Sequence, residues 1–258
     1  MRIGLFLKRE VIDDDFEAKT ISLIKSKGHV YDNENPEFVF SVGGDGTFLK
    51  AVHKYLDKLD SITFVCFNKG NLGYFSDFVV EDMEHVLEEI NGKEFESRKY
   101  RLLKAMIDKE AIYAVNEIRI ENPFHTLISE VYVNGGYLET FRGNGLVVST
   151  SIGSTAYNKS LGGAVVEPSL EVMQVNEIAP INNRLFSSLG SSLVLSDKNV
   201  VTFKGDYSKV LVGYDYLIKS ELHTNEIKIE LSDKRVSVLS KKSKTYINKL
   251  SDSFVMRK

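Results

Sequence analysis

Hydrophobic and polar residues follow two different patterns along the chain, and the change falls near residue 100. In the first part, short apolar segments alternate with segments in which apolar residues recur at the spacing of one helical face. Such alternation predicts a parallel sheet with helices on both faces. The strands are predicted at residues 3–7, 37–42 and 61–67, and the helices within residues 13–28, 48–56 and 81–92.

After residue 100 the pattern changes to a series of strand-like segments. Between two of them, Asn134 and Gly135 supply the positive φ angles that a tight hairpin turn requires. One helical interruption is predicted at about residues 169–177. The strand-like segments are residues 101–108, 111–120, 126–133, 137–141, 145–150, 192–196, 200–205, 209–217, 226–231 and 236–240.

These patterns predict two domains. Residues 1–100 are expected to form an α/β domain with a Rossmann-like parallel sheet, and residues 101–258 a β-rich, sandwich-like domain. An alternative for the last residues is that they pack back onto the N-terminal domain. A cleft between the two domains is the default expectation for a ligand site.

Composition narrows the class of protein. With 258 residues, 43% of them hydrophobic, the chain is long enough for two modest domains, and its net charge of -3 argues against a general nucleic-acid binder. The apolar run before Lys8 is too short for a signal segment or a membrane span. The single cysteine, Cys66, lies in an apolar strand and is expected to be a buried structural thiol. We expect a cytoplasmic protein without a membrane or nucleic-acid partner.

A glycine-rich loop lies where the second strand gives way to a helix. Gly43, Gly44 and Gly46 would let backbone N–H groups approach a phosphate at the start of that helix. Asp45 would repel a phosphate, so it indicates a proton acceptor or a cation ligand. The alternative is that Asp45 is only a helix cap or a turn residue. The loop is neither a P-loop nor a G-x-G-x-x-G fingerprint, since position 49 is leucine.

Two further polar groups interrupt the β-rich part. Asn116 and Glu117 lie within an otherwise apolar strand, where neighbours point to opposite faces unless a bulge or a strand end intervenes. Residues 153–157, Gly-Ser-Thr-Ala-Tyr, form a second strand-to-loop junction, and its tyrosine is able to stack on a purine. The alternatives are a solvated strand end for the first group, and helix capping and core packing for the second. The five dispersed histidines make a protein-only zinc site improbable.

Taken together, three motifs resemble the hallmark segments of the NAD kinases. They are GGDGT at residues 43–47, NE at residues 116–117 and GSTAY at residues 153–157. GGDGT alone is shared with diacylglycerol kinases and phosphofructokinase-like relatives. The segment GNLGYF at residues 70–75 also resembles the family's glycine-rich turn after the third strand, and INNRLF at residues 181–186 resembles the short Gram-positive type of the family.

The resemblance implies an ATP-dependent transfer of a phosphoryl group, with Mg²⁺ or another divalent cation, to the 2′-hydroxyl of the adenosine ribose of NAD, which gives NADP. It makes Asp45 the catalytic base and Gly43, Gly44 and Gly46 the phosphate cradle. It also implies a homotetramer. The other ligand-binding positions that it implies are Thr47, Leu49, Tyr74, Phe75, Asn116, Glu117, Arg142, Asn144, Thr155, Ala156, Tyr157 and Ala179.

The resemblance assigns these positions to different parts of the ligand. Asn116 would contact the adenine, Glu117 a ribose hydroxyl, and residues 155–157 would form the adenine pocket. Tyr74 and Phe75 would border the dinucleotide. Arg142 and Ala179 would lie at a subunit junction near the nicotinamide half.

Two positions depart from the family pattern. Asn144 stands where the family has a carboxylate, and Tyr216, after the matching Asp215, stands where related short members carry a histidine. These departures leave open a dinucleotide-binding regulator with weak or no catalysis. A second alternative is a lipid or sugar kinase of the wider superfamily that shares GGDGT, and the NE and GSTAY motifs disfavour it.

Overall fold

The structure is a computed structural model that describes residues 1–8, 14–69 and 73–255, so Asp13 of the first predicted helix lies outside the described residues. The chain divides into two compact units. Unit 1 contains Met1–Lys99 and Arg235–Lys258, and unit 2 contains Tyr100–Lys234. The C-terminal residues that we placed in the second domain therefore group with unit 1. No helix in the described part of the chain is long and apolar enough to cross a membrane.

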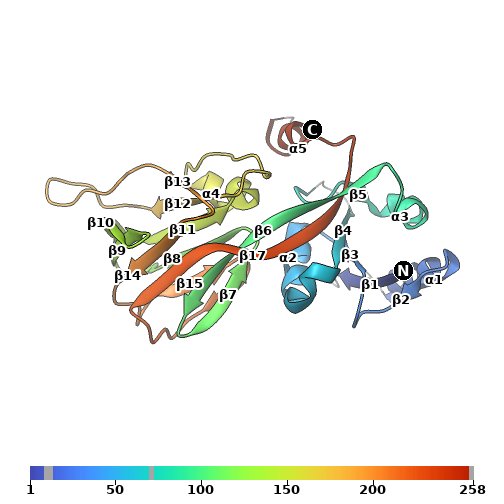
Figure 1. Cartoon of the computed structure of the whole chain (residues 1–258), viewed down its shortest axis with the longest axis horizontal. Helices are drawn as coiled ribbons and strands as arrows, with labels where there is room; N and C mark the ends of the chain where they lie inside the picture. Colours follow the sequence, from blue (N-terminus) through green and yellow to red (C-terminus); the bar gives the residue numbers. More distant parts are fainter. Residues whose placement is uncertain (9–13, 70–72, 256–258) are drawn as a thin grey trace. The chain divides into compact units, whose positions relative to one another are not determined.

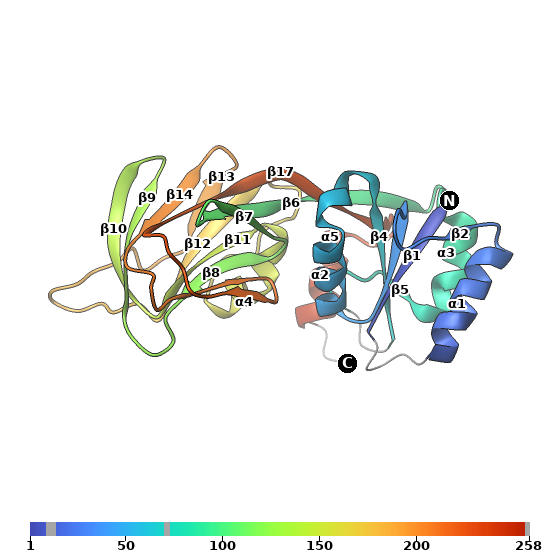
Figure 2. The same cartoon turned by 90° about the horizontal axis from the view of Figure 1, so that it is seen from below.

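A parallel sheet forms the centre of unit 1. Its strands are β2 (Val30–Tyr31), β1 (Arg2–Leu7), β3 (Phe38–Val42) and β4 (Thr63–Asn68), in that spatial order. The far edge of β4 pairs in parallel with β5 (Phe78–Val79) and with the end of β17 (Glu226–Lys241). Figure 2 shows α1 (Asp14–Ser26) and α3 (Met83–Glu89) on one face and α2 (Asp45–Lys54) on the other. The predicted doubly covered parallel sheet is confirmed.

The core of unit 1 is rich in aromatic side chains. Phe40, Phe67 and Phe78 are fully buried, and their ring centroids lie 5.0 Å and 5.8 Å apart along the series. On the α2 side, Phe48 packs edge-on to Phe64. Cys66 is buried in β4 between these layers. This packing fixes β3 and β4 side by side, which determines where their following loops meet.

Unit 2 consists of two antiparallel sheets (Figure 1). One contains β10 (Gly136–Gly143), β9 (Leu127–Val133), β14 (Val200–Lys204) and β17, with β6 (Phe95–Ile107) and β7 (Glu110–Ala114) beside β17. The other has the order β13 (Leu193–Ser196), β12 (Val172–Ile178), β11 (Gly145–Thr150), β8 (Glu117–Glu121), β15 (Leu211–Tyr214) and β16 (Leu217–Lys219). One core cluster draws buried residues from both sheets. The β-rich second half is confirmed.

The tight turn at Asn134 and Gly135 is also confirmed. Their φ angles are 50° and 81°, and Val133 pairs with Gly136 across the turn of the β9–β10 hairpin.

Four details of the predicted elements were wrong. Residues 172–178 are strand β12 rather than a helix, because Met173 and Val175 alternate into the core and pair with β11. The segment 111–120 splits into β7 and β8, which join different sheets. The segment 209–217 splits into β15 and β16 at a turn that holds Asp215 at a φ of 49°. In contrast, 226–231 and 236–240 form the single strand β17.

The buried thiol allows a direct test of this core. Burial, and secondarily the nearby negative charge of Asp45, raise the pKa of Cys66. We expect the native protein to resist a thiol reagent such as 5,5′-dithiobis(2-nitrobenzoate), and the guanidinium-unfolded chain to react with one equivalent. Rapid reaction of the native chain would contradict the placement of β4 in the core.

Candidate active site

The glycine loop joins the end of β3 to the start of α2. Gly43 has a φ of 152°, and a Cβ there would collide with the side chain of Thr47. A Cβ at Gly44 or Gly46 would meet no atom within 4 Å. The backbone of the turn is therefore open on one side, at the positive end of the ten-residue helix α2. This geometry suits an anionic ligand.

Asp45 is held by a second loop rather than by its own helix. Its Oδ2 accepts a hydrogen bond from the backbone N–H of Tyr74 at 3.0 Å, and its Oδ1 accepts one from Phe75 at 3.1 Å. A Cβ at Gly73 would lie 2.5 Å from Oδ1, so only glycine fits there. The N-cap residue of α2 is Gly44, and it makes no side-chain cap. The interpretation of Asp45 as a helix cap is therefore wrong.

Three of the expected ligand-binding residues in this loop region face the protein interior. Thr47, Leu49 and Phe75 are buried, and the Phe75 ring lies 4.4 Å from that of Phe48. Tyr74 is half-buried. Residues 70–72 of the GNLGYF segment lie outside the described residues. These buried side chains pack beneath the glycine turn, on its interior side, and so fix the position of its backbone.

In unit 2, a carboxylate also organises a backbone segment. Asp215 accepts hydrogen bonds from the N–H groups of Val115 at 2.9 Å and Asn116 at 2.7 Å. Thr150 donates its hydroxyl to the carbonyl of Val115 at 2.7 Å. The chain passes from one sheet to the other at this point, so Asn116 and Glu117 are not adjacent residues of one regular strand.

The NE and GSTAY motifs form one cluster. Gly153 packs so closely against the backbone of Asn116 that a side chain would not fit. The backbone N–H of Tyr157, the first residue of α4 (Tyr157–Ser160), partly offsets the raised pKa of the Glu117 carboxyl group. Thr155, Ala156 and Tyr157 are half-buried. The structure therefore brings together residues that are about 40 positions apart, which neither pattern alone indicated.

Arg119 is a residue of this cluster that the sequence analysis missed. Its guanidinium lies 5.7 Å from the centre of the Tyr157 ring and 3.8 Å from Glu117 Oε1. Side chains alternate along a strand, so positions 117 and 119 of β8 lie on the same face. This alternation could have identified Arg119 as a neighbour of Glu117 from the sequence.

The cluster contains buried polar atoms that have no hydrogen-bond partner among the described residues. Within the described part of the chain, Asn116 Oδ1 and Glu117 Oε2 are buried and have no hydrogen-bond partner. Such atoms are uncommon and require an explanation. Burial, followed by the negative charge of Asp215, raises the pKa of Glu117 to about 7. A carboxyl group that titrates near neutral pH is able both to donate and to accept a hydrogen bond.

Arg142, Asn144 and Ala179 form a third group at one end of unit 2. A Cβ at Gly143 would lie 2.7 Å from the carbonyl oxygen of Ala179, and the N–H of Asn144 donates to Ile178 at 2.9 Å. The Arg142 guanidinium lies 4.3 Å from the Phe186 ring centre. The sequence-predicted positions therefore lie in three groups: one in unit 1 and two in unit 2.

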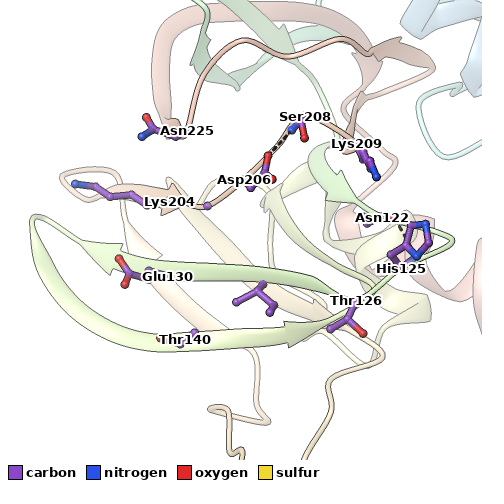
Figure 3. A pocket seen from close by; sticks show the side chains of 12 residues that line it. Asn122, His125, Thr126, Glu130, Thr140, Lys204, Asp206, Ser208, Lys209 and Asn225 are labelled. Carbon is purple, nitrogen blue, oxygen red and sulfur yellow. Dashed lines mark hydrogen bonds between the residues drawn. The ribbon is translucent and has the colours of Figure 1, made fainter.

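The described residues of the three groups contain no metal-binding cluster, and the cavity in Figure 3 is lined by other residues. Among the described residues, no three His, Cys, Asp or Glu side chains are arranged to hold a metal ion. A cavity of about 780 Å³ lies in unit 2 (Figure 3), and no expected site residue lines it. It combines Lys204 and Lys209 with Glu130 and Asp206, so its lining does not favour one sign of ligand charge.

The raised pKa of Glu117 predicts a pH-dependent stability. The folded-state pKa of about 7 lies above the ordinary 4.5, so folding favours the protonated form. This stabilisation is fully present below pH 4.5 and is lost as the pH rises through 7. Relative to Glu117→Gln, the wild-type free energy of unfolding should fall by at most about 3 kcal/mol between these limits. Urea unfolding at a series of pH values measures this difference, and parallel curves would contradict it.

Two family models match the chain: an ATP-NAD kinase N-terminal domain over residues 6–95 and an ATP-NAD kinase C-terminal domain over residues 115–241. Among curated proteins, NAD kinase 1 of Oceanobacillus iheyensis is 38% identical, covering 99% of this chain and 98% of the relative. The NAD kinase of Staphylococcus epidermidis is 36% identical, with coverage of 99% and 98%.

Two solved structures have the same fold. An Archaeoglobus fulgidus NAD kinase in complex with ATP is 25% identical, with a TM-score of 0.80 over 98% of this chain and 99% of that one. A yeast NADH kinase complexed with NADH has a TM-score of 0.84 over 100% and 89% of the two chains, and its 17% identity supports the fold alone. From the matched domains and the full-length relatives we conclude that this chain belongs to the NAD kinase family.

Proposed function

We propose that this NAD kinase transfers the γ-phosphoryl group of ATP to the 2′-hydroxyl of the adenosine ribose of NAD, with Asp45 as the group that accepts the hydroxyl proton. The observation that carries this proposal is the Asp45 carboxylate, which two backbone amides orient beside an open glycine turn. The family matches favour neither a lipid or sugar kinase nor a non-catalytic regulator.

The geometry around Asp45 suits phosphoryl transfer. This reaction depends mainly on positioning and on neutralising negative charge, with little covalent chemistry for the protein to perform. Each carboxylate oxygen accepts one amide hydrogen bond and keeps further acceptor capacity for a substrate hydroxyl. The open backbone at Gly44 and Gly46 leaves room for phosphate oxygens at the start of α2.

The cluster in unit 2 supports recognition of the adenosine. We assign the unpartnered Oδ1 of Asn116 to an adenine donor and Glu117 to a ribose hydroxyl. Thr155, Ala156 and Tyr157 would surround the base, and Tyr157 presents an aromatic ring. Arg119, beside that ring, would limit its movement.

A divalent cation such as Mg²⁺ would neutralise the charge of the transferred phosphates. Asp45 is the acidic residue of the glycine turn, and the described residues offer no three-ligand cluster. This donor set fits a cation that is held mainly by the nucleotide phosphates, as Mg²⁺ commonly is.

We further propose a cytoplasmic homotetramer. The long loop between β12 and β13 extends beyond its sheet (Figure 1) and exposes Ile181, Leu185 and Leu189. Exposed apolar side chains in one segment are typical of a protein interface. Arg142, Asn144 and Ala179 lie at the base of this loop, where a second subunit would complete their contacts with the nicotinamide half.

The role of Asp45 predicts the effect of Asp45→Asn. The amide cannot accept a proton, so kcat should fall at least about 100-fold while NAD binding persists. A coupled assay for NADP formation and calorimetric NAD binding measure the two effects. Asp57→Asn, a change at an exposed residue just after α2, serves as the control. Near-normal turnover of Asp45→Asn would refute its catalytic role, and absence of NADP in the wild type would refute the function.

Gly73→Ala tests the orientation of the carboxylate without removing it. The new Cβ would lie 2.5 Å from Asp45 Oδ1, so the carboxylate or the loop must move. A shift of the carboxylate by about 1 Å should lower kcat by about 10- to 100-fold. Gly136→Ala, whose Cβ would meet its nearest atom at 3.3 Å, provides a matched control. Wild-type turnover in a folded Gly73→Ala variant would show that this contact is not needed.

A further inference from the structure

A buried ion pair connects the C-terminal segment to the interior of unit 1. Lys249, on α5 (Tyr246–Leu250), lies with its Nζ 3.0 Å from Asp77 Oδ1. The Asp77 side chain is 0% exposed and that of Lys249 is 9% exposed. The backbone N–H of Lys241, at the end of β17, donates to the other oxygen of Asp77 at 3.2 Å. An aspartate is seldom fully buried unless it is paired in this way.

Asp77 belongs to the loop that orients Asp45. Tyr74 and Phe75, which donate to the Asp45 carboxylate, precede it by three and two positions. Phe78 and Val79, which follow it, pair with β4 as strand β5. Residues 73–79 are therefore fixed at Asp45, at Asp77 and at the edge of β4.

The charges of this region also lie close to one thiol. Asp45, Lys249 and Asp77 all contribute electrostatically to the environment of Cys66 on β4.

The segment that carries Lys249 has its own attachments. Thr245 and Asn248 form a reciprocal capping box at the start of α5. The Arg98 guanidinium donates to the carbonyl of Lys244 at 2.9 Å, and the N–H of Lys242 donates to Glu94 at 3.0 Å. These contacts hold the segment that carries Lys249 through residues outside the 73–79 loop.

We propose that Lys249 is a positioning residue for the phosphoryl-transfer site: by holding Asp77, it fixes the backbone amides of Tyr74 and Phe75 that orient the Asp45 carboxylate. The proposal rests on the proposed function of Asp45 and adds a contribution from the C-terminal segment. Lys249 acts through Asp77 and the loop, and no contact with a substrate is assigned to it. If this is correct, loss of its charge should lower turnover through misorientation of Asp45.

The test begins with Lys249→Met, which keeps an unbranched apolar side chain but leaves Asp77 buried without its cation. We expect kcat for NADP formation to fall by about 10- to 100-fold and the KM for ATP to stay within about twofold. The second readout is hydrogen exchange of a peptide that covers residues 73–79. Exchange at Tyr74 and Phe75 should become faster, since both amides lose a fixed acceptor.

Two further variants separate positioning from general destabilisation. In the double variant Asp77→Asn/Lys249→Met neither the ion pair nor an unpaired buried charge is present, so we expect the free energy of unfolding to return toward the wild-type value while kcat stays low and the exchange of residues 73–79 stays fast. Lys244→Met removes a cation of the same segment, which pairs with Asp252 at 3.4 Å, and should leave both readouts unchanged.

The outcomes are distinguishable. Unchanged kcat or unchanged exchange in a folded Lys249→Met variant would overturn the positioning role. A return of kcat to the wild-type level in the double variant would also overturn it, because the loss in the single variant would then come from the unpaired buried charge of Asp77 and not from loss of the positioning contact. If the wild type forms no NADP, the proposed function fails, while hydrogen exchange still tests the link from Lys249 to Tyr74 and Phe75.

Discussion

The candidate site in unit 1 depends on the contact between the Asp45 carboxylate and the amides of Tyr74 and Phe75. Asp45 follows β3, and the two amides follow β4. These strands pair in parallel, with Val42 opposite Phe67, so their carboxyl ends meet at one edge of the sheet. The contact therefore needs the whole sheet, and it also needs Gly73, where a Cβ would reach the carboxylate. A side chain that would otherwise cap a helix is thus directed to a neighbouring loop.

Unit 2 uses the same interaction for another purpose. Asp215 accepts two consecutive backbone N–H groups, those of Val115 and Asn116, at the point where the chain changes sheets. Its negative charge then acts on Glu117, whose burial already disfavours ionisation, and the pKa rises to about 7. A carboxylate that serves as a backbone clamp thereby also adjusts the protonation of a neighbouring binding residue.

The sequence analysis predicted the features that depend on local pattern. The parallel sheet of unit 1, the turn at Asn134 and Gly135 and the β-rich second half all follow from periodicity or turn chemistry. It failed at residues 172–178, where the pairing of β12 with β11 and β13 decides the structure.

In the candidate site, motifs identified the residues but not their partners. The hydrogen bonds from Val115 and Asn116 to Asp215 span 100 and 99 positions, and no local pattern carries this information. Arg119 was missed although it shares a strand face with Glu117, because a charged residue on a strand is also compatible with simple solvation. Conversely, Thr47 and Phe75 belong to family-like motifs, yet they are buried and support the turn.

The ion pair of Asp77 and Lys249 shows why a buried charge can be useful where an apolar contact would be more stabilising. Replacing a buried pair by well-packed apolar side chains is often neutral or favourable, whereas removing one partner costs about 3–5 kcal/mol. An apolar contact would hold α5 against the rest of unit 1 but would tolerate small shifts of the loop. The ion pair and the hydrogen bond from Lys241 instead each restrain one oxygen of Asp77. Because Asp77 lies two residues from Phe75, this restriction extends to the amides that orient Asp45.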